Sequence, residues 1–356
     1  MRMMKAQVLE EPCKMVLKDV PVPQISSHEV LIKVKYCGIC GSDWGSYTGK
    51  YEDEVKCLPL TTGHEFFGYV EEVGADVSKL KPGDRVAVDI CLPCGTCYYC
   101  RRGDHLLCDT FKQIGIHTAG AFAEYVKAPW QNCYIVPDSV TDYQAAFIEP
   151  LTTTLNASRK MDLKIASSLA VIGCGLGIIH AALGKIRGAA PVIVVGDSQE
   201  RLKMARQMGV DHTIDITVTP DAVAEVKKLT DGIGADYVIE AVGTSKTYEQ
   251  AFQMVRKGGK VEAFGICADD DYASLPPVKF VIEEKKVSGS CAGIGNDWGD
   301  AIKLLQYKMI DPTPMISMIV PLAEVETALK ELRENPRLVK VLVGPELKER
   351  KVLYKD

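Results

Sequence analysis

The first third of the chain alternates hydrophobic and polar positions with the period of a β-strand. Residues 29–35 carry part of this pattern, and residues 69–73 repeat it and end at Gly74. A Lys-Pro-Gly-Asp turn at 81–84 leads into the apolar run 85–88. Strand-like runs bounded by turn residues are typical of sheets that bury one face. This part of the chain is therefore predicted to be β-rich, with a further strand at 123–126.

After Pro150 the pattern changes to short apolar runs separated by helix-length segments. The segment from Gln199 to Met208, for example, has helical spacing and stops at Gly209. Strands that alternate with helices predict a parallel, doubly wound sheet. The predicted strands of this region are 169–172, 191–195, 236–240 and 260–264.

The last part of the chain returns to a β-like pattern at 339–343. A chain of 356 residues is longer than one hydrophobic core normally serves, so two domains are expected. We predict an α/β protein in which an α/β domain at 154–289 is inserted into a β-rich domain. The β-rich domain would consist of residues 1–153 and 290–356.

Composition excludes several classes of partner. The formal net charge is −5, and no run of Lys or Arg marks a surface for nucleic acid or an anionic membrane. The first residues lack the apolar core of a signal peptide. The most apolar stretch, 169–184, contains four glycines and is too short for a membrane span. We expect neither a nucleic-acid partner nor a membrane.

The thirteen cysteines are distributed unevenly, and their number is odd. In a chain that can bury a core, this does not resemble a disulfide framework. It indicates a metal in a reducing compartment, so a cytoplasmic location is expected. Five of the cysteines crowd one segment: Cys91, Cys94, Cys97, Cys100 and Cys108.

The spacing Cys94-x2-Cys97-x2-Cys100-x7-Cys108 predicts a structural zinc site. Four thiolates in a short loop can surround Zn²⁺ tetrahedrally, and such a closed site holds the loop in place. An iron–sulfur cluster is the alternative, but ferredoxin runs have a three-residue final gap followed by Pro. A third alternative, that the four cysteines are buried free thiols, is disfavoured because the loop is polar. Cys91 is interpreted as an ordinary thiol.

A second set of metal-binding residue types is dispersed along the chain. Cys40, His64 and Glu149 each have an ordinary alternative: a buried thiol, a core histidine and a helix-end carboxylate. A catalytic zinc has three protein ligands and keeps one position open. The glycines around Cys40 and His64 allow the close backbone approach that such a site needs.

A resemblance to a known family rests on several motifs. Gly63-His64-Glu65-x2-Gly68-x5-Gly74-x2-Val77 resembles the signature of the zinc-containing alcohol dehydrogenases of the medium-chain dehydrogenase/reductase superfamily. The four-cysteine lobe and the dinucleotide fold follow in the family's order. Cys-Gly-Ser-Asp at 40–43 with Ile-Glu-Pro-Leu at 148–151 is similar to the sorbitol (polyol) dehydrogenase branch. The resemblance implies a GroES-like catalytic domain and a Rossmann NAD-binding domain.

Carried over by position, the resemblance makes Cys40, His64 and Glu149 ligands of a catalytic zinc. Glu65 would be an alternate ligand or an acid behind the ligands, and Asp43 would orient His64. One thiolate and one carboxylate neutralise Zn²⁺, and a neutral imidazole adds no charge. The metal can then lower the pKa of an alcohol without becoming a fixed cation.

Gly173-Cys174-Gly175-Leu176-Gly177 follows a predicted strand and opens a helix, as a pyrophosphate loop requires. Ile178 occupies the place of the third glycine. Asp197 ends the next strand, where an acid accepts hydrogen bonds from ribose hydroxyls and repels a 2′-phosphate, so NAD is expected rather than NADP. Arg201 is expected to flank the adenosine or to be simply solvated. The resemblance adds residues near the nicotinamide: Val242, Phe264, Gly265 and Ile266.

The implied reaction oxidises a secondary alcohol to a ketone by hydride transfer to NAD, with Ser42 passing the hydroxyl proton outward. Two positions depart from the family: Gly45 replaces a common histidine, and Ser290–Ile294 lacks the arginine of the sorbitol branch. A polyol is the expected substrate, and L-threonine or a vicinal diol (butanediol) is the alternative. A metal-free NAD(P)H-binding relative is a third reading. The family implies a homo-oligomer, a tetramer or a dimer.

Overall fold

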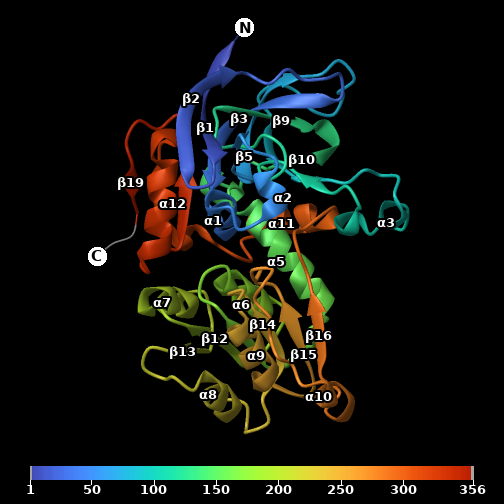
Figure 1. The fold of residues 1–356 in the computed structure, drawn as a ribbon, viewed down its shortest axis with the longest axis vertical. Helices are drawn as coiled ribbons and strands as arrows, with labels where there is room; N and C mark the ends of the chain where they lie inside the picture. The colour runs from blue at the N-terminus through green and yellow to red at the C-terminus, as the bar shows by residue number, and fades with distance from the viewer. Residues whose placement is uncertain (1, 354–356) are drawn as a thin grey trace. The chain divides into compact units, whose positions relative to one another are not determined.

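The computed structural model describes residues 2–353 and divides into two compact units (Figure 1). One unit consists of the chain up to Pro150 together with the chain from Ile294 onward. The other is the continuous segment Leu151–Gly293. The chain passes from the first unit to the second inside helix α5 (Ile148–Met161).

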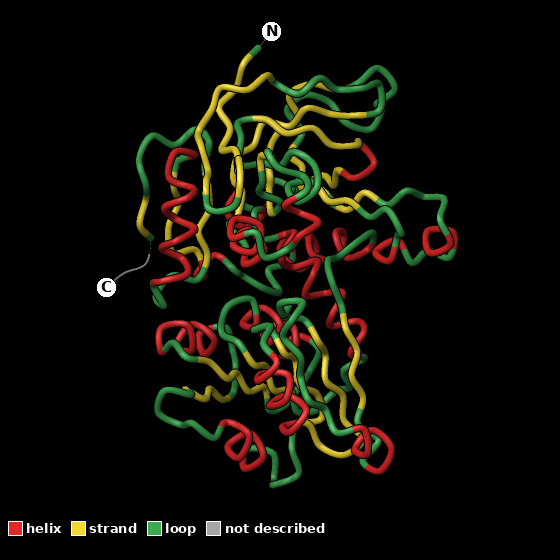
Figure 2. The backbone as a smooth tube through the Cα atoms, viewed as in Figure 1, coloured by secondary structure: helices red, strands yellow, loops and turns green. Residues whose placement is uncertain are grey.

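The first unit is rich in antiparallel strands, which Figure 2 shows in yellow. Seven strands of its largest sheet follow the order β10-β6-β5-β3-β18-β17-β19, and β9 pairs with β3. The C-terminal strand β18 pairs with the N-terminal strand β3, with Leu342 opposite Gly38. The strands of this sheet are β3 (Glu29–Gly38), β5 (Glu65–Val73), β6 (Arg85–Val88), β9 (Tyr125–Pro129), β10 (Cys133–Ile135), β17 (Ile316–Val320), β18 (Lys340–Val343) and β19 (Lys351–Val352).

Smaller elements complete this unit. Two further sheets have the orders β2-β1-β4 and β7-β8. Short 3₁₀ turns lie at 105–107, 130–132, 313–315 and 322–324. The remaining elements are β1 (Met3–Glu11), β2 (Lys14–Pro21), β4 (Leu60–Thr61), β7 (Cys91–Leu92), β8 (Lys112–Gln113), α1 (Gly41–Thr48), α2 (Glu52–Val55), α3 (Tyr98–Arg101), α4 (Asp142–Ala145), α11 (Asn296–Gln306) and α12 (Val325–Glu334).

The second unit is built on a parallel sheet with the order β13-β12-β11-β14-β15-β16. This is the 3-2-1-4-5-6 order of dinucleotide-binding folds, and it confirms the predicted doubly wound sheet. Its elements are β11 (Leu169–Ile172), α6 (Gly177–Ile186), β12 (Val192–Gly196), α7 (Gln199–Gln207), β13 (His212–Asp215), α8 (Ala222–Lys228), β14 (Ala235–Glu240), α9 (Ser245–Met254), β15 (Val255–Ala263), α10 (Pro277–Ile282) and β16 (Lys286–Gly289).

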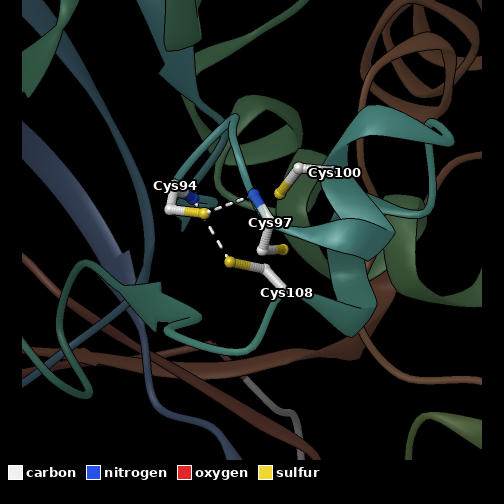
Figure 3. A group of neighbouring side chains, drawn as sticks. All are labelled: Cys94, Cys97, Cys100 and Cys108. Carbon is white, nitrogen blue, oxygen red and sulfur yellow. Dashed lines mark hydrogen bonds between the residues drawn. The ribbon is translucent and has the colours of Figure 1, made fainter.

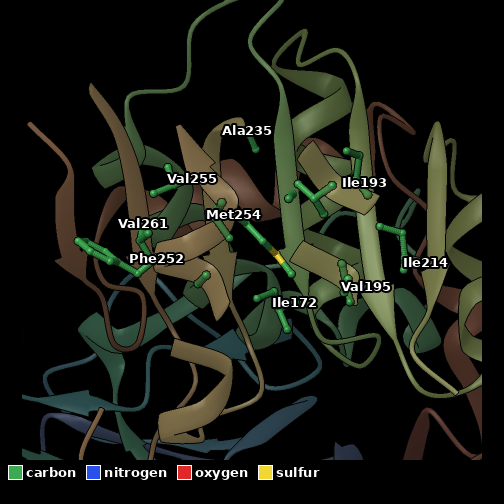
Figure 4. Packing of buried hydrophobic residues seen from close by; sticks show 14 residues of the cluster. Ile172, Ile193, Val195, Ile214, Ala235, Phe252, Met254, Val255 and Val261 are labelled. Atoms are coloured by element: carbon green, nitrogen blue, oxygen red, sulfur yellow. The ribbon is translucent and has the colours of Figure 1, made fainter. Parts of the chain in front are cut away.

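Helices cover both faces of the parallel sheet. On one face, Ile172 and Val195 pack with Phe252 of α9 in a fully apolar cluster, shown in Figure 4. The neighbouring Val171 points to the other face, where a side-chain atom at Gly177 of α6 would lie 3.0 Å from it. Burial on both faces explains why these strands are continuous apolar runs rather than alternating ones.

All thirteen cysteines are free thiols. Among the described residues, none of the helices combines the length and the apolar character that crossing a membrane requires.

Candidate functional site

The four cysteines of the predicted structural site converge on one another. The sulfurs of Cys94, Cys97, Cys100 and Cys108 all lie within 4.8 Å of one another (Figure 3). The loop can turn this tightly because Gly95 adopts a positive φ of 74°, which residues other than glycine rarely adopt. Four sulfurs around one point are the donor set of a closed zinc site.

Backbone N–H groups in this lobe point at the sulfurs. The amides of Thr96 and Cys97 donate to Sγ of Cys94 at 3.4 and 3.3 Å, and they lower the pKa of Cys94 to about 5. Burial, together with the neighbouring thiols, raises the pKa of Cys100 to about 12. The backbone amide of Cys94 also lowers the pKa of Cys108. The lobe thus favours thiolates at these two positions, and a divalent cation would stabilise the remaining ones.

A second cluster forms from dispersed residues at the end of β3 and the start of β5. The donor atoms of Cys40, His64 and Glu65 lie within 4.8 Å of one another. Cys40 precedes α1, and its amide donates to Asp43 Oδ2 at 2.8 Å. His64 and Glu65 are buried. The thiol, imidazole and carboxylate that this cluster brings together suit a catalytic zinc.

Glycine backbone packing fixes the position of His64. Gly63 has a φ of +93°, and Ala121 donates to its carbonyl oxygen at 2.8 Å. A side-chain atom at Gly115 would lie 2.2 Å from that same carbonyl oxygen and 3.0 Å from Cα of His64. The loop 115–120 therefore lies directly against the backbone that carries the histidine.

Two polar side chains flank the imidazole of His64. Ser42 Oγ lies 3.3 Å from Nε2, and Asp43 Oδ1 lies 3.5 Å from Nδ1. Burial lowers the pKa of His64, but the charges of Asp43 and Cys40 outweigh it and hold the pKa well above its usual value. Ser42 and Asp43 therefore lie beside the two ring nitrogens of His64, and Asp43 lies where it could orient the imidazole.

Glu149 lies in the first turn of α5 and is 7% exposed. Burial raises the pKa of Glu149 to about 7; the charge of His64 lowers it and that of Glu65 raises it. Glu149 is thus close enough to interact with both residues, although the tight cluster contains Glu65 instead. The geometry leaves two carboxylates beside one cysteine and one histidine.

Lys340 is a further residue of this cluster that the sequence analysis does not identify. It begins β18, is 8% exposed, and forms an ion pair with Glu65. Burial lowers the pKa of Lys340, but the charges of Glu65 and Cys40 outweigh it and raise the pKa. The signal in the sequence is a lysine inside the apolar run Val339–Val343.

The place of the missing histidine at Gly45 is covered by an aromatic ring. A side-chain atom at Gly45 would lie 2.2 Å from Cε2 of Tyr51. One position further along, Ser46 Oγ contacts the carboxylate of Glu54, and burial raises the pKa of that carboxyl group. Tyr51 thus fills the volume next to α1 that a longer side chain at Gly45 would need.

The glycine loop of the second unit has the shape of a phosphate cradle. Gly173 has a φ of +115°, and no atom lies within 4 Å of the position that a side chain at Gly175 would take. Helix α6 begins at Gly177, after Leu176. An open backbone at a helix N-terminus fits a pyrophosphate. Ile178, at the place of the third glycine, is fully buried.

The other predicted nucleotide residues lie at the carboxyl ends of the strands. Asp197 follows β12, is exposed, and its Oδ1 lies 3.6 Å from Sγ of Cys174. Val242 and Ile266 are 50% and 56% exposed. Phe264 packs edge-on against His180, with ring centroids 4.3 Å apart. Two more complete the set: Arg201, half-buried in α7, and Gly265, close to the backbone of Gly243.

Comparison with known proteins covers both units. Residues 26–138 match the alcohol dehydrogenase GroES-like domain, and residues 175–307 match the zinc-binding dehydrogenase family. The chain is 34% identical over 332 residues to a sorbitol dehydrogenase of Halalkalibacterium halodurans, which covers 92% of this chain and 95% of that protein. It is 35% identical to an L-threonine 3-dehydrogenase of Bacillus subtilis, which covers 93% and 95%.

Among solved structures, a zinc-binding dehydrogenase from Sinorhizobium meliloti bound to NADP is similar over the whole fold. The TM-score is 0.90 at 30% sequence identity, and the match covers 97% of this chain and all of the other. The match therefore spans both units of the chain.

Proposed function

Because the chain belongs to the zinc-containing alcohol dehydrogenase family, we propose that it oxidises a secondary alcohol of the polyol or sugar-alcohol class to a ketone, with NAD as the hydride acceptor. The observation that carries the proposal is the convergence of Cys40 and His64, beside which two buried carboxylates lie, those of Glu65 and Glu149. Ser42 Oγ lies 3.3 Å from the imidazole. The donor set is that of a zinc site with an open position.

In this proposal Cys40, His64 and Glu149 hold the catalytic zinc, and Asp43 orients the imidazole. When bound there, zinc supplies the acidification of an alcohol hydroxyl, and NAD accepts the hydride. Ser42 takes the released proton outward, because its hydroxyl lies beside the ligand atoms and both donates and accepts hydrogen bonds. The four cysteines of the lobe hold a structural zinc.

The preference for NAD rests on Asp197. Its exposed carboxylate lies at the end of β12, where it would accept from ribose hydroxyls and repel a 2′-phosphate. The glycine loop and the start of α6 would hold the pyrophosphate. Likeness to sorbitol dehydrogenase supports a polyol, and likeness to L-threonine 3-dehydrogenase supports L-threonine as the second candidate.

Location and assembly follow from other features. Thirteen free thiols favour a reducing cytoplasm.

Helix α10 exposes Val281 and Ile282 at 78% and 75%, next to the edge strand β16. An exposed apolar patch beside an unpaired strand edge favours association with a second copy of the chain. We therefore propose a homodimer or a tetramer.

The deciding experiment compares kcat/KM for a panel of polyols, L-threonine and butanediols with NAD and with NADP. A polyol with NAD is expected to give the highest value, with about two zinc ions per chain. The matched variant Glu149→Ala is expected to lose the catalytic zinc and nearly all turnover. Full turnover in Glu149→Ala would contradict the assignment of Glu149 as a zinc ligand. A strong preference for NADP would contradict the role given to Asp197.

A further inference from the structure

Lys340 and Glu65 form a buried ion pair at the point where three segments of the first unit meet. Nζ of Lys340 contacts the Glu65 carboxylate and donates to the carbonyl oxygen of Ile39 at 3.1 Å. A side-chain atom at Gly38 would lie 2.3 Å from Oε2 of Glu65 and 2.8 Å from Cε of Lys340. Glycine at 38 therefore makes the room in which the pair fits.

The charges of the cluster indicate what the pair does. Cys40, Glu65 and Glu149 bring three acidic groups to a buried site, and Lys340 is close enough to interact with all three. A zinc ion is neutralised by two of them, the thiolate and one carboxylate. The third negative charge needs its own partner, because an unpaired buried charge is strongly destabilising. Lys340 supplies that partner to Glu65.

Position makes Glu65 a competitor for the metal. Its carboxylate lies within 4.8 Å of the donor atoms of Cys40 and His64, which is within reach of an ion bound to both. A carboxylate that entered the coordination shell would take the position that a catalytic zinc keeps open for substrate. The observed ion pair holds the carboxylate on the lysine instead.

On the basis of the proposed function, we propose that Lys340 is a positioning residue. Its ion pair with Glu65 keeps the Glu65 carboxylate out of the open coordination position of the catalytic zinc. Lys340 then decides which of the two carboxylates binds the metal. Glu149 is the ligand, and Glu65 is the neutralised neighbour. The lysine itself touches neither substrate nor cofactor in this role.

The test is the rate at which the purified enzyme loses its catalytic zinc to a chelator, together with kcat and KM. The catalytic zinc is recognised as the one whose loss runs in step with loss of turnover. In Lys340→Met the freed Glu65 becomes an additional ligand, so zinc loss slows about tenfold. Turnover falls by a similar factor, because the open position is occupied. A merely structural lysine predicts the opposite sign, a looser site that loses zinc faster.

Two further variants complete the test. Lys340→Arg keeps a cation beside Glu65 and is expected to retain wild-type zinc loss and most turnover. The double variant Lys340→Met with Glu65→Gln removes both charges of the pair, so zinc loss returns to the wild-type rate and turnover recovers. Faster zinc loss in Lys340→Met, or no reversal in the double variant, overturns the inference and leaves the proposed function standing. A wild-type chain with zinc only in the cysteine lobe overturns both.

Discussion

His180 is a buried imidazole in the middle of α6. Neither ring nitrogen has a hydrogen-bond partner among the described residues. The ring of Phe264 packs against the imidazole at an angle of 82°. Burial lowers the pKa of His180 to about 3 from its usual 6.5. The folded protein therefore keeps this histidine neutral at pH values at which the unfolded chain protonates it.

This difference makes the second unit sensitive to acid. Because the folded pKa is depressed, stability is lost as the pH falls below about 6.5, and the loss continues down to about pH 3. Between pH 7 and pH 5, His180→Leu should lose about 2 kcal/mol less free energy of unfolding than the wild type. Urea unfolding at the two pH values measures this. The exposed His212 is the control: His212→Gln should follow the wild type, and an equal pH dependence in His180→Leu would contradict the prediction.

The sequence predicts candidate metal ligands better than it predicts the residues that pack around them. Cys40 and His64 stand out in the sequence because their glycine-rich surroundings suit a metal site. Lys340 does not, because its partner Glu65 is 275 positions away and only the pairing of β18 with β3 brings them together. The packing of Tyr51 over Gly45 could not be predicted either, because one ring that fills the space beside a glycine leaves no periodic pattern in the sequence.

The loop 115–120 illustrates how an element without regular structure positions a ligand. Gly115 and Gly83 both have positive φ, 85° and 90°, but only Gly115 lies against other backbone atoms. Alanine at either position costs about 1 kcal/mol for the left-handed backbone. At Gly115 the clash with Gly63 adds about 1–3 kcal/mol.

Gly115→Ala should therefore lower the free energy of unfolding more than Gly83→Ala, and it should also weaken retention of the catalytic zinc. Urea unfolding and zinc content measure the two effects. Equal losses in the two variants would show that the loop does not support His64.

Under the proposed function, a zinc ion stabilises the cysteine lobe in place of a hydrophobic core. Cys97→Ser should lower the zinc content from about two to about one per chain and expose the segment 94–108 to proteolysis. Cys91→Ala is the matched control, because Cys91 lies outside the four-sulfur cluster and both zinc ions should remain. Two zinc ions in Cys97→Ser would contradict the structural-site assignment.

Element prediction succeeded where periodicity was sustained. The runs 85–88 and 169–172 are strands with the predicted bounds, and 69–73 is the end of β5. The run 123–126 becomes a strand only from Tyr125. Short helices such as α4 (Asp142–Ala145) escaped prediction, because one turn of helix is too short to show a hydrophobic period.

At the scale of the whole molecule, the exposed face of α10 predicts how copies associate. Val281→Asp places a charge in that apolar patch and should shift sedimentation from an oligomer to a monomer. Ile165 is similarly exposed, 84% against 78%, but lies outside α10 and β16. Ile165→Asp should therefore leave the assembly unchanged. A wild-type monomer, or an intact oligomer in Val281→Asp, would contradict the proposed surface.

The unit that carries the candidate zinc ligands is built from two separate parts of the chain, so the direction of synthesis imposes an order on its assembly. The ribosome releases Cys40 and His64 early, then the whole continuous segment 151–293, and only later β18 with Lys340. The parallel-sheet unit can complete itself while the antiparallel sheet still lacks the strand that pairs with β3. During that interval Glu65 lacks Lys340, its partner in the ion pair. The nascent chain is thus expected to hold its metal ligands in a provisional arrangement until residue 340 emerges.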